Sequence, residues 1–355
     1  MRILVATDAF QPQVNGVVRT YERLAERLSA RGEDLFFLTP YGFKTFPCPT
    51  YPSIRLALPS RVKCARFIES AQPDAIHVAT EGPVGWMTRN YCIRHRIPFT
   101  TSFHTRFPEY VSSRLAIPEA ITHALLRRFH NAGSGVMAAT ESLATHLRQH
   151  GYQRVMNWTR GVDTDLFRPR PVRKFGPGPV FLYVGRVAVE KNIGAFLELS
   201  LPGTKVVVGD GPALASLKKQ FPGTVFTGQQ TGEALAESYA SADVFVFPSR
   251  TDTFGIVLLE AMASGLPIAA YPVMGPADVV QHGTSGVLGE DLAACAIAAL
   301  NLDRANPRSA ALTFSWDHAA TVFLANLAWR IQSQRSPLTP SQKTLSGPGK
   351  ISSRI

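Results

Sequence analysis

Short apolar segments alternate with helix-length segments along most of this chain, and this alternation restricts the folds that the chain can adopt. In the first half, helices should separate most of the strands, which we expect at residues 3–8, 35–39, 54–58, 75–80, 99–104 and 136–140. In the second half, a helix-length segment should follow each strand, at residues 180–185, 205–209, 225–227, 244–247 and 268–271. Strands joined through helices pair in parallel, so the order predicts an α/β protein with doubly wound parallel sheets.

The chain of 355 residues is longer than one hydrophobic core usually supports, which predicts two domains. We expect a Rossmann-like domain at residues 1–168, a Pro/Gly-rich charged linker at 169–179 and a second Rossmann-like domain at 180–316. Residues 317–332 should form a last helix, and the polar, basic segment 333–355 should be disordered. Open parallel sheets bind ligands beyond the carboxyl ends of their strands, so the loops there should carry the functional residues.

Two carboxylates, Asp252 and Glu260, lie eight residues apart on either side of an expected helix start. The preceding strand ends at a proline, and the helix, expected at residues 255–263, should end at Gly265 in the C′ position. The loop between strand and helix would present backbone amides at a helix start, where phosphate groups bind. The residues expected to contact a ligand there are Thr253, Phe254, Gly255 and Ile256.

Two cations, Arg186 and Lys191, follow another expected strand and lie five residues apart. This spacing covers one loop and the start of the next helix. Arginine offers a fork of donors and lysine a point charge, so the two could hold a diphosphate together. The alternative for this pair alone is two solvated surface cations.

Taken together, these residues resemble the motifs of family-4 retaining glycosyltransferases with the GT-B fold. Asp252 and Glu260 are similar to the family's E-x7-E signature, with Asp in place of the first Glu, and Arg186 with Lys191 to its G-R-x-x-x-x-K clamp. The resemblance covers roughly residues 1–330 and looks closest to bacterial mannosyltransferases and to sulfoquinovosyl- or glycosyl-diacylglycerol synthases. It implies two Rossmann-like domains facing a cleft, with the last helix crossing back to the first domain.

Further residues gain a role only through this resemblance. The loop with Asn15 and Gly16 resembles the family's N-terminal loop, which approaches the diphosphate and the acceptor, and His104 resembles its histidine beside the donor sugar. Asp210 belongs to a V-G-D-G-P turn, and Gly228 lies where the family commonly places the nucleobase. For each of these residues the alternative is ordinary turn chemistry or a structural role.

The resemblance also implies a mechanism. Asp252 would contact the hexose and Glu260 the ribose of a UDP- or GDP-sugar, so neither would act as a nucleophile. We therefore expect same-face substitution, with the leaving β-phosphate accepting the proton of the acceptor while Arg186 and Lys191 stabilise that phosphate. No metal and no cofactor besides the nucleotide sugar is expected. Asp at position 252 shortens the arm by one methylene and leaves the choice of hexose open.

The charge is unevenly distributed. Residues 1–168 carry a net charge of +8, residues 169–332 carry −1 and residues 333–355 carry +4. Two basic and apolar segments in the first domain, residues 55–68 and 118–131, indicate an anionic membrane surface and a lipid acceptor such as diacylglycerol. The alternative for each segment is an amphipathic helix packed on its own domain.

The sequence also bears on compartment. No stretch has the roughly eighteen uninterrupted apolar residues that a membrane-spanning helix needs. The apolar core within residues 1–8 is too short for a signal peptide. The four cysteines show no C-x-x-C spacing, which argues against a zinc site and a disulfide framework built from them; they are Cys48, Cys64, Cys92 and Cys295. We expect a cytoplasmic protein, peripheral on the inner face of the plasma membrane.

Other classes of function share parts of this pattern. A hydrolysing sugar-nucleotide 2-epimerase shares the GT-B architecture and the donor, but the two motifs above favour transfer. A nicotinamide oxidoreductase shares the type of sheet, but the loop at residues 8–19 is not G-x-G-x-x-G. A non-enzymatic nucleic-acid-binding protein would account for the net charge of +11, yet no recognisable RNA or DNA motif is present. Among glycosyltransferases, a soluble or polysaccharide acceptor is the alternative to a lipid.

Overall fold

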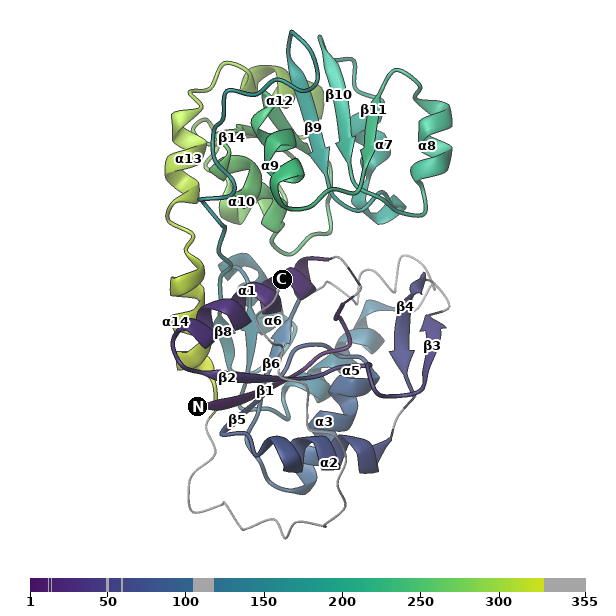
Figure 1. Ribbon diagram of the computed structural model, residues 1–355, viewed down its shortest axis with the longest axis vertical. Helices are drawn as coiled ribbons and strands as arrows, with labels where there is room; N and C mark the ends of the chain where they lie inside the picture. Colours follow the sequence, from purple (N-terminus) through teal and green to yellow (C-terminus); the bar gives the residue numbers. More distant parts are fainter. Residues whose placement is uncertain (12, 14, 49–50, 59, 105–117, 329–355) are drawn as a thin grey trace. The chain divides into compact units, whose positions relative to one another are not determined.

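The computed structural model describes residues 1–11, 13, 15–48, 51–58, 60–104 and 118–328 (Figure 1). These residues divide into two compact units. The first unit comprises the described residues up to Ala139, Ala144–Trp158 and the described residues from Ala320 onward. The second comprises Thr140–Leu143 and Thr159–Ala319. Residues 159–168, which we expected in the first domain, therefore fold with the second unit. The expected disordered segment at 333–355 lies outside the described residues.

The first unit contains a parallel sheet of six strands in the order β2-β1-β5-β6-β7-β8. Its strands are β1 (Arg2–Ala6), β2 (Asp34–Leu38), β5 (Ala75–Val78), β6 (Thr100–Phe103), β7 (Gly135–Ala138) and β8 (Val155–Asn157). The connecting helices are α1 (Gly16–Ala30), α2 (Arg61–Ala71), α3 (Pro83–Arg94), α5 (Glu119–His130) and α6 (Glu141–Gln149). The chain continues from β1 to β2 on one side and later to β5 on the other, so the strand order reverses between β1 and β5.

One expected strand of this sheet was wrong. Residues 54–58 do not join the parallel sheet: β4 (Tyr51–Ala57) pairs antiparallel with β3 (Thr45–Cys48) in a separate two-stranded hairpin. Only two residues separate the strands, and a connection that short can join antiparallel strands but not parallel neighbours. The short strand β8 was not predicted, because three residues with partial burial give no clear period-2 signal.

Both faces of the parallel sheet in the first unit are buried. In β1, Leu4 and Ala6 belong to a core shared with α2 and α3, whereas Ile3 and Val5 belong to a second core shared with α1. This alternation follows from the period of two along a strand. The second core also contains Phe323 of α14 (Trp316–Asn326). The last helix thus starts in the second unit and ends packed in the first, which confirms the predicted return of the chain.

The second unit contains six parallel strands in the order β11-β10-β9-β12-β13-β14. They are β9 (Val180–Val184), β10 (Thr204–Val208), β11 (Val225–Gly228), β12 (Val244–Phe247), β13 (Ile268–Ala270) and β14 (Gly286–Leu288), the last of which was not predicted. The intervening segments are η1 (Val189–Lys191), α7 (Ile193–Leu197), α8 (Leu214–Gln220), α9 (Gly232–Ala240), α10 (Ile256–Ala263), α11 (Pro276–Val279), α12 (Leu292–Ala299) and α13 (Ala305–Ala311). The strand order reverses between β9 and β12, where sheets of this type bind ligands.

Two features bear on the predicted environment. Within the described ranges, no helix combines the length and the apolar character required to cross a bilayer. Cys64, Cys92 and Cys295 are buried thiols. Burial raises the pKa of the Cys64 thiol to about 11, so this side chain stays protonated and behaves as a small apolar group.

Candidate functional site

The loops after β9 and β12 meet at the point where the strand order of the second unit reverses. Lys191 Nζ lies 2.5 Å from Asp252 Oδ1, although the two residues are 61 positions apart in the sequence. The side-chain amide of Asn192 donates a hydrogen bond to the Pro248 carbonyl at 3.0 Å and helps to join the two loops. The structure therefore places a cation and an anion from the two predicted motifs in direct contact at this edge of the sheet.

Arg186 lies half-buried in the loop directly after β9. The Tyr183 hydroxyl donates to the Arg186 carbonyl at 2.8 Å and fixes the backbone there. Burial raises the pKa of Tyr183, and the negative charges of Asp252 and Glu190 raise it further, so the hydroxyl keeps the proton that it donates. Sequence reasoning missed Tyr183, which reads as an apolar strand residue.

The loops after β9, β10 and β11 are held together through glycines. A Cβ on Gly209 would lie 1.9 Å from the Gly185 carbonyl oxygen, so only glycine allows these backbones to approach. Gly209 N donates to the Gly228 carbonyl at 2.9 Å, and Val187 N donates to the Asp210 carbonyl at 2.9 Å. The Asp210 carboxylate is exposed. The V-G-D-G-P turn thus has a clear structural role, and any contact of Asp210 or Gly228 with a ligand remains a proposal.

Helix α10 carries Glu260 on its second turn. The helix starts at Ile256, with Gly255 as its N-cap at φ 80°, one residue later than expected. Glu260 is 4% exposed, and its Oε2 accepts a hydrogen bond from the Tyr239 hydroxyl at 2.8 Å. A buried carboxylate requires such partners. Tyr239 was not predicted, because it lies on α9 and only the packing of α9 against α10 brings it to Glu260.

Thr253 and Phe254 occupy the loop before α10 with their side chains turned inward. They are 8% and 5% exposed, and the Phe254 ring packs against Phe314. Their side chains therefore support the loop, and a ligand could reach these residues only through the backbone, as the sequence suggested. Gly275 approaches the same loop so closely that a Cβ there would lie 2.7 Å from the Asp252 carbonyl oxygen.

In the first unit, His104 follows β6 and is half-buried. Its Nε2 lies 3.1 Å from the Tyr21 hydroxyl, which also lies 2.9 Å from Nε2 of the buried His77. His77 Nδ1 in turn lies 2.9 Å from Thr100 Oγ1. This chain of polar groups fixes the orientation of the His104 ring. No local sequence pattern predicts this chain of groups, because its members lie on α1, β5 and β6.

The predicted loop after β1 contains Asn15 and Gly16. The Asn15 side chain caps α1, and its Oδ1 accepts from Val17 N and Val18 N, each at 3.0 Å. Gly16 is the first residue of the helix. The side-chain oxygen of Asn15 is thus used for capping, so a role of this loop in ligand binding remains a proposal.

Asp8 lies where the strand order of the first unit reverses and was missed from sequence. Its carboxylate accepts hydrogen bonds from Val84 N at 2.9 Å, Gly85 N at 3.2 Å and the Thr80 hydroxyl at 3.0 Å, and so binds the start of α3. Burial raises the pKa of Asp8 to about 6, against the lowering effect of these hydrogen bonds. The sequence shows Asp8 at the end of the first strand, but it does not show that the side chain is buried.

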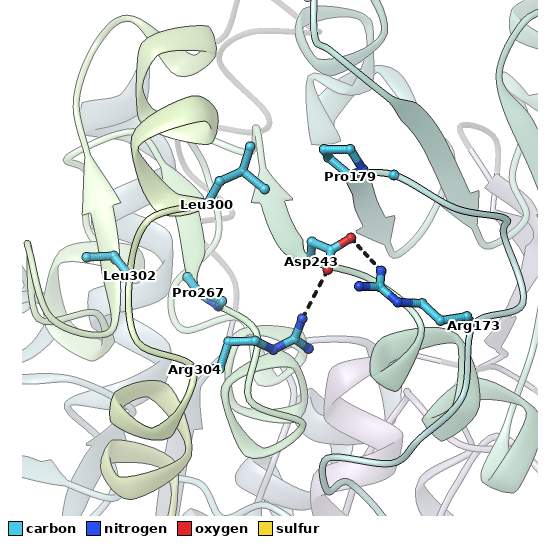
Figure 2. Close-up of a pocket in the computed structure, with 8 residues that line it drawn as sticks. Arg173, Pro179, Asp243, Pro267, Leu300, Leu302 and Arg304 are labelled. Atoms are coloured by element: carbon cyan, nitrogen blue, oxygen red, sulfur yellow. Dashed lines mark hydrogen bonds and ion pairs between the residues drawn. The ribbon is translucent and has the colours of Figure 1, made fainter.

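A cavity of about 250 Å³ lies at the opposite edge of the sheet in the second unit (Figure 2). Its lining includes Pro179, Asp243 and Pro267, which directly precede β9, β12 and β13. Figure 2 shows Asp243 between two guanidinium groups, 2.8 Å from Arg173 and 3.2 Å from Arg304. Because Asp243 pairs with both cations and lies at the amino ends of the strands, this cluster holds the linker segment to the sheet and is separate from the site above.

The fold and the site define the class of this protein. Each unit is a Rossmann-like parallel sheet, and a last helix returns the chain to the first unit, which is the GT-B fold of glycosyltransferases. The solved structure of Anabaena Alr3699/HepE in complex with UDP-glucose has the same fold, with a TM-score of 0.72 and 17% sequence identity, over 92% of this chain and 99% of that chain.

Sequence comparison identifies the family. The model for Glycosyltransferase Family 4 matches residues 14–166, and that for Glycosyl transferases group 1 matches residues 178–303. A GDP-mannose-dependent alpha-mannosyltransferase of Corynebacterium glutamicum is 31% identical over 96% of this chain and 92% of its own length. The alpha-monoglucosyldiacylglycerol synthase of Streptococcus pneumoniae is 27% identical over 76% and 71%. The chain belongs to the family-4 glycosyltransferases and is a transferase.

Proposed function

We propose that this protein is a retaining hexosyltransferase that moves a hexose from a UDP- or GDP-sugar to a membrane lipid such as diacylglycerol. The observation that carries the proposal is the meeting of Lys191 and Asp252 at the strand-order reversal of the second unit, with Glu260 on the helix that follows Asp252. A cation, a helix start and two carboxylates in this place suit the diphosphate and the hydroxyl groups of a nucleotide sugar.

The roles follow from charge and burial. Lys191 and Arg186 stabilise the leaving diphosphate, for which an ammonium and a guanidinium are suitable donors. Asp252 binds a hydroxyl of the hexose, and Glu260 binds the ribose. In the first unit, His104 is proposed to contact the donor sugar, with its ring oriented by Tyr21.

The environment of the carboxylates also supports same-face substitution. A double displacement requires a carboxylate placed as a nucleophile, but Asp252 is paired with Lys191 and Glu260 is 4% exposed and bonded to Tyr239. With both carboxylates assigned to binding the donor, the proposal is that the acceptor hydroxyl attacks from the face that the nucleoside diphosphate leaves. The β-phosphate takes the proton of that hydroxyl as the bond to the anomeric carbon breaks.

The choice of donor and acceptor is supported by relatives. One is named as a GDP-mannose-dependent mannosyltransferase, and another as a monoglucosyldiacylglycerol synthase. The exposed face of α5 fits a lipid surface: Ile121 is 61% exposed, Leu125 is 52% exposed and Arg128 is exposed beside them. Apolar and basic groups on one helix suit adsorption to an anionic membrane. We therefore propose a peripheral protein on the cytoplasmic face of the plasma membrane.

Arg127, which the sequence placed in the same basic segment, is unsuitable for this contact. It is half-buried, and its guanidinium donates to the His150 carbonyl at 3.0 Å. The membrane test therefore uses Arg128→Glu together with Leu125→Ala, and a charge-matched control, Lys219→Glu, on the exposed surface of α8 in the second unit.

The experiment measures vesicle flotation and hexose transfer from UDP- and GDP-sugars to diacylglycerol in phosphatidylglycerol vesicles. We expect the wild type and Lys219→Glu to bind at low salt and to transfer hexose, and the α5 double variant to lose both while keeping its nucleotide affinity. Two results together would contradict the lipid assignment: no binding of the wild type to phosphatidylglycerol vesicles at low salt, and equal transfer to a soluble acceptor with and without vesicles. Release of the free 2-epimer of the donor sugar, from incubation with donor alone, would favour the epimerase.

A further inference from the structure

Three histidines of the first unit converge outside the site described above. His146 lies on α6, His150 directly follows that helix, and His123 lies on α5; both helices are labelled in Figure 1. One ring nitrogen from each residue lies within 4.8 Å of those of the other two. We propose that His123, His146 and His150 form a binding site for a divalent transition-metal ion of the zinc type.

The spacing of the residues explains why they can share a ligand. Residues four apart project from the same face of a helix, so His146 and His150 are neighbours, and two histidines at this spacing are a common zinc-binding pair. The ring centroids are 4.2 Å apart for His146 and His150 and 4.2 Å apart for His123 and His150. The third ring is therefore supplied across the contact between α5 and the end of α6.

Hydrogen bonds at Nδ1 of His150 and of His123 favour the tautomer in which Nε2 can bind a metal. His150 Nδ1 lies 2.8 Å from the His146 carbonyl oxygen, which can only accept, so Nδ1 carries the proton and Nε2 carries the lone pair that a metal requires. His123 Nδ1 lies 3.2 Å from the Tyr152 hydroxyl, which can accept a hydrogen bond from Nδ1–H and so leave Nε2 for the metal. Metal-binding histidines usually have such a partner at the second nitrogen.

The donor set selects the class of metal. Three imidazoles without a carboxylate suit Zn²⁺, Co²⁺, Ni²⁺ or Cu²⁺, whereas Mg²⁺ and Ca²⁺ require oxygen ligands. His123 is buried, and His146 and His150 are half-buried, so water can reach one side of the cluster and occupy a fourth position. A metal here would link α5 to the end of α6 and stabilise the first unit without entering the reaction.

The test uses the full chain without a histidine tag, stripped with a chelator and then titrated with Zn²⁺, with Co²⁺ as a spectroscopic probe and Mg²⁺ as a comparison. We expect one Zn²⁺ per chain, a rise in melting temperature with Zn²⁺ but not with Mg²⁺, and visible absorption bands of Co²⁺ bound by nitrogen. His146→Gln and His150→Gln avoid the buried His123 and should each weaken Zn²⁺ binding about 100-fold or more.

Two further variants distinguish a built site from adventitious binding. Tyr152→Phe removes the hydroxyl beside His123 and should weaken Zn²⁺ binding about 10-fold. His95→Gln changes an exposed histidine at the end of α3 and should leave the affinity unchanged. Equal Zn²⁺ affinity in the wild type, His146→Gln and His150→Gln would overturn the proposal and leave the three rings as ordinary packing. Melting of the metal-free variants shows that they fold.

Discussion

Asp252→Asn should change affinity for the free nucleoside diphosphate and use of the intact sugar donor in opposite directions. The carboxylate lies 2.5 Å from the Lys191 ammonium, and the two side chains are 21% and 28% exposed. Partly exposed ion pairs contribute about 0.2–1 kcal/mol. Releasing Lys191 for the phosphate should therefore raise affinity for UDP or GDP by about 1.4- to 5-fold, as measured by titration calorimetry.

Transfer should respond in the opposite direction, because the same substitution removes a charged hydrogen bond to the hexose. Bonds of this kind contribute about 1.5–3 kcal/mol, so kcat/KM for the sugar donor should fall by about 10- to 160-fold. The control is Glu290→Gln, which breaks a 2.7 Å ion pair with Arg250, a residue in the same loop as Asp252. This control should change neither the nucleotide affinity nor kcat/KM. A parallel fall in nucleotide affinity and in transfer would refute the assignment of Asp252 to the sugar.

Three further substitutions test the remaining roles. Arg186→Ala should reduce turnover at saturating donor by on the order of 100-fold; near-wild-type turnover would exclude it from leaving-group stabilisation. Tyr239→Phe removes the 2.8 Å bond to the buried Glu260 and should lower the free energy of unfolding by about 1–3 kcal/mol, measured by urea denaturation; an unchanged value would show that Glu260 does not depend on this bond. In the folded protein the pKa of Asp8 is raised to about 6, so the folded state binds this proton more tightly than the unfolded state does. Protonation of Asp8 therefore contributes about 3 kcal/mol to the free energy of unfolding below pH 4, and this contribution is lost as the pH rises through 6. Asp8→Asn should remove this dependence, and equal pH profiles of wild type and variant would contradict it.

Much of the fold was predictable from the sequence, because apolar strands and their order are local signals. The parallel strands β9 and β12 were found as uninterrupted apolar runs, and their loops led directly to Lys191 and Asp252. The segment at 54–58 was assigned to the wrong sheet, because an apolar run does not reveal its pairing partner.

The candidate site was predictable only in part. Residues in strand-end motifs could be proposed individually, but the Lys191–Asp252 contact depends on which strands are neighbours in the sheet. Tyr239 and Tyr21, which hold Glu260 and His104, lie on helices whose packing no local pattern encodes. The burial of Asp8 likewise arises only from the assembled sheet and α3.

The anomeric configuration of the first-formed product tests the central claim most directly. Wild-type protein is incubated with an α-linked UDP- or GDP-hexose and diacylglycerol vesicles, and the glycolipid is analysed by NMR. Same-face substitution at the site formed by Lys191, Asp252 and Glu260 predicts an α-glycoside. A β-glycoside, or free hexose with no glycolipid, would contradict the account.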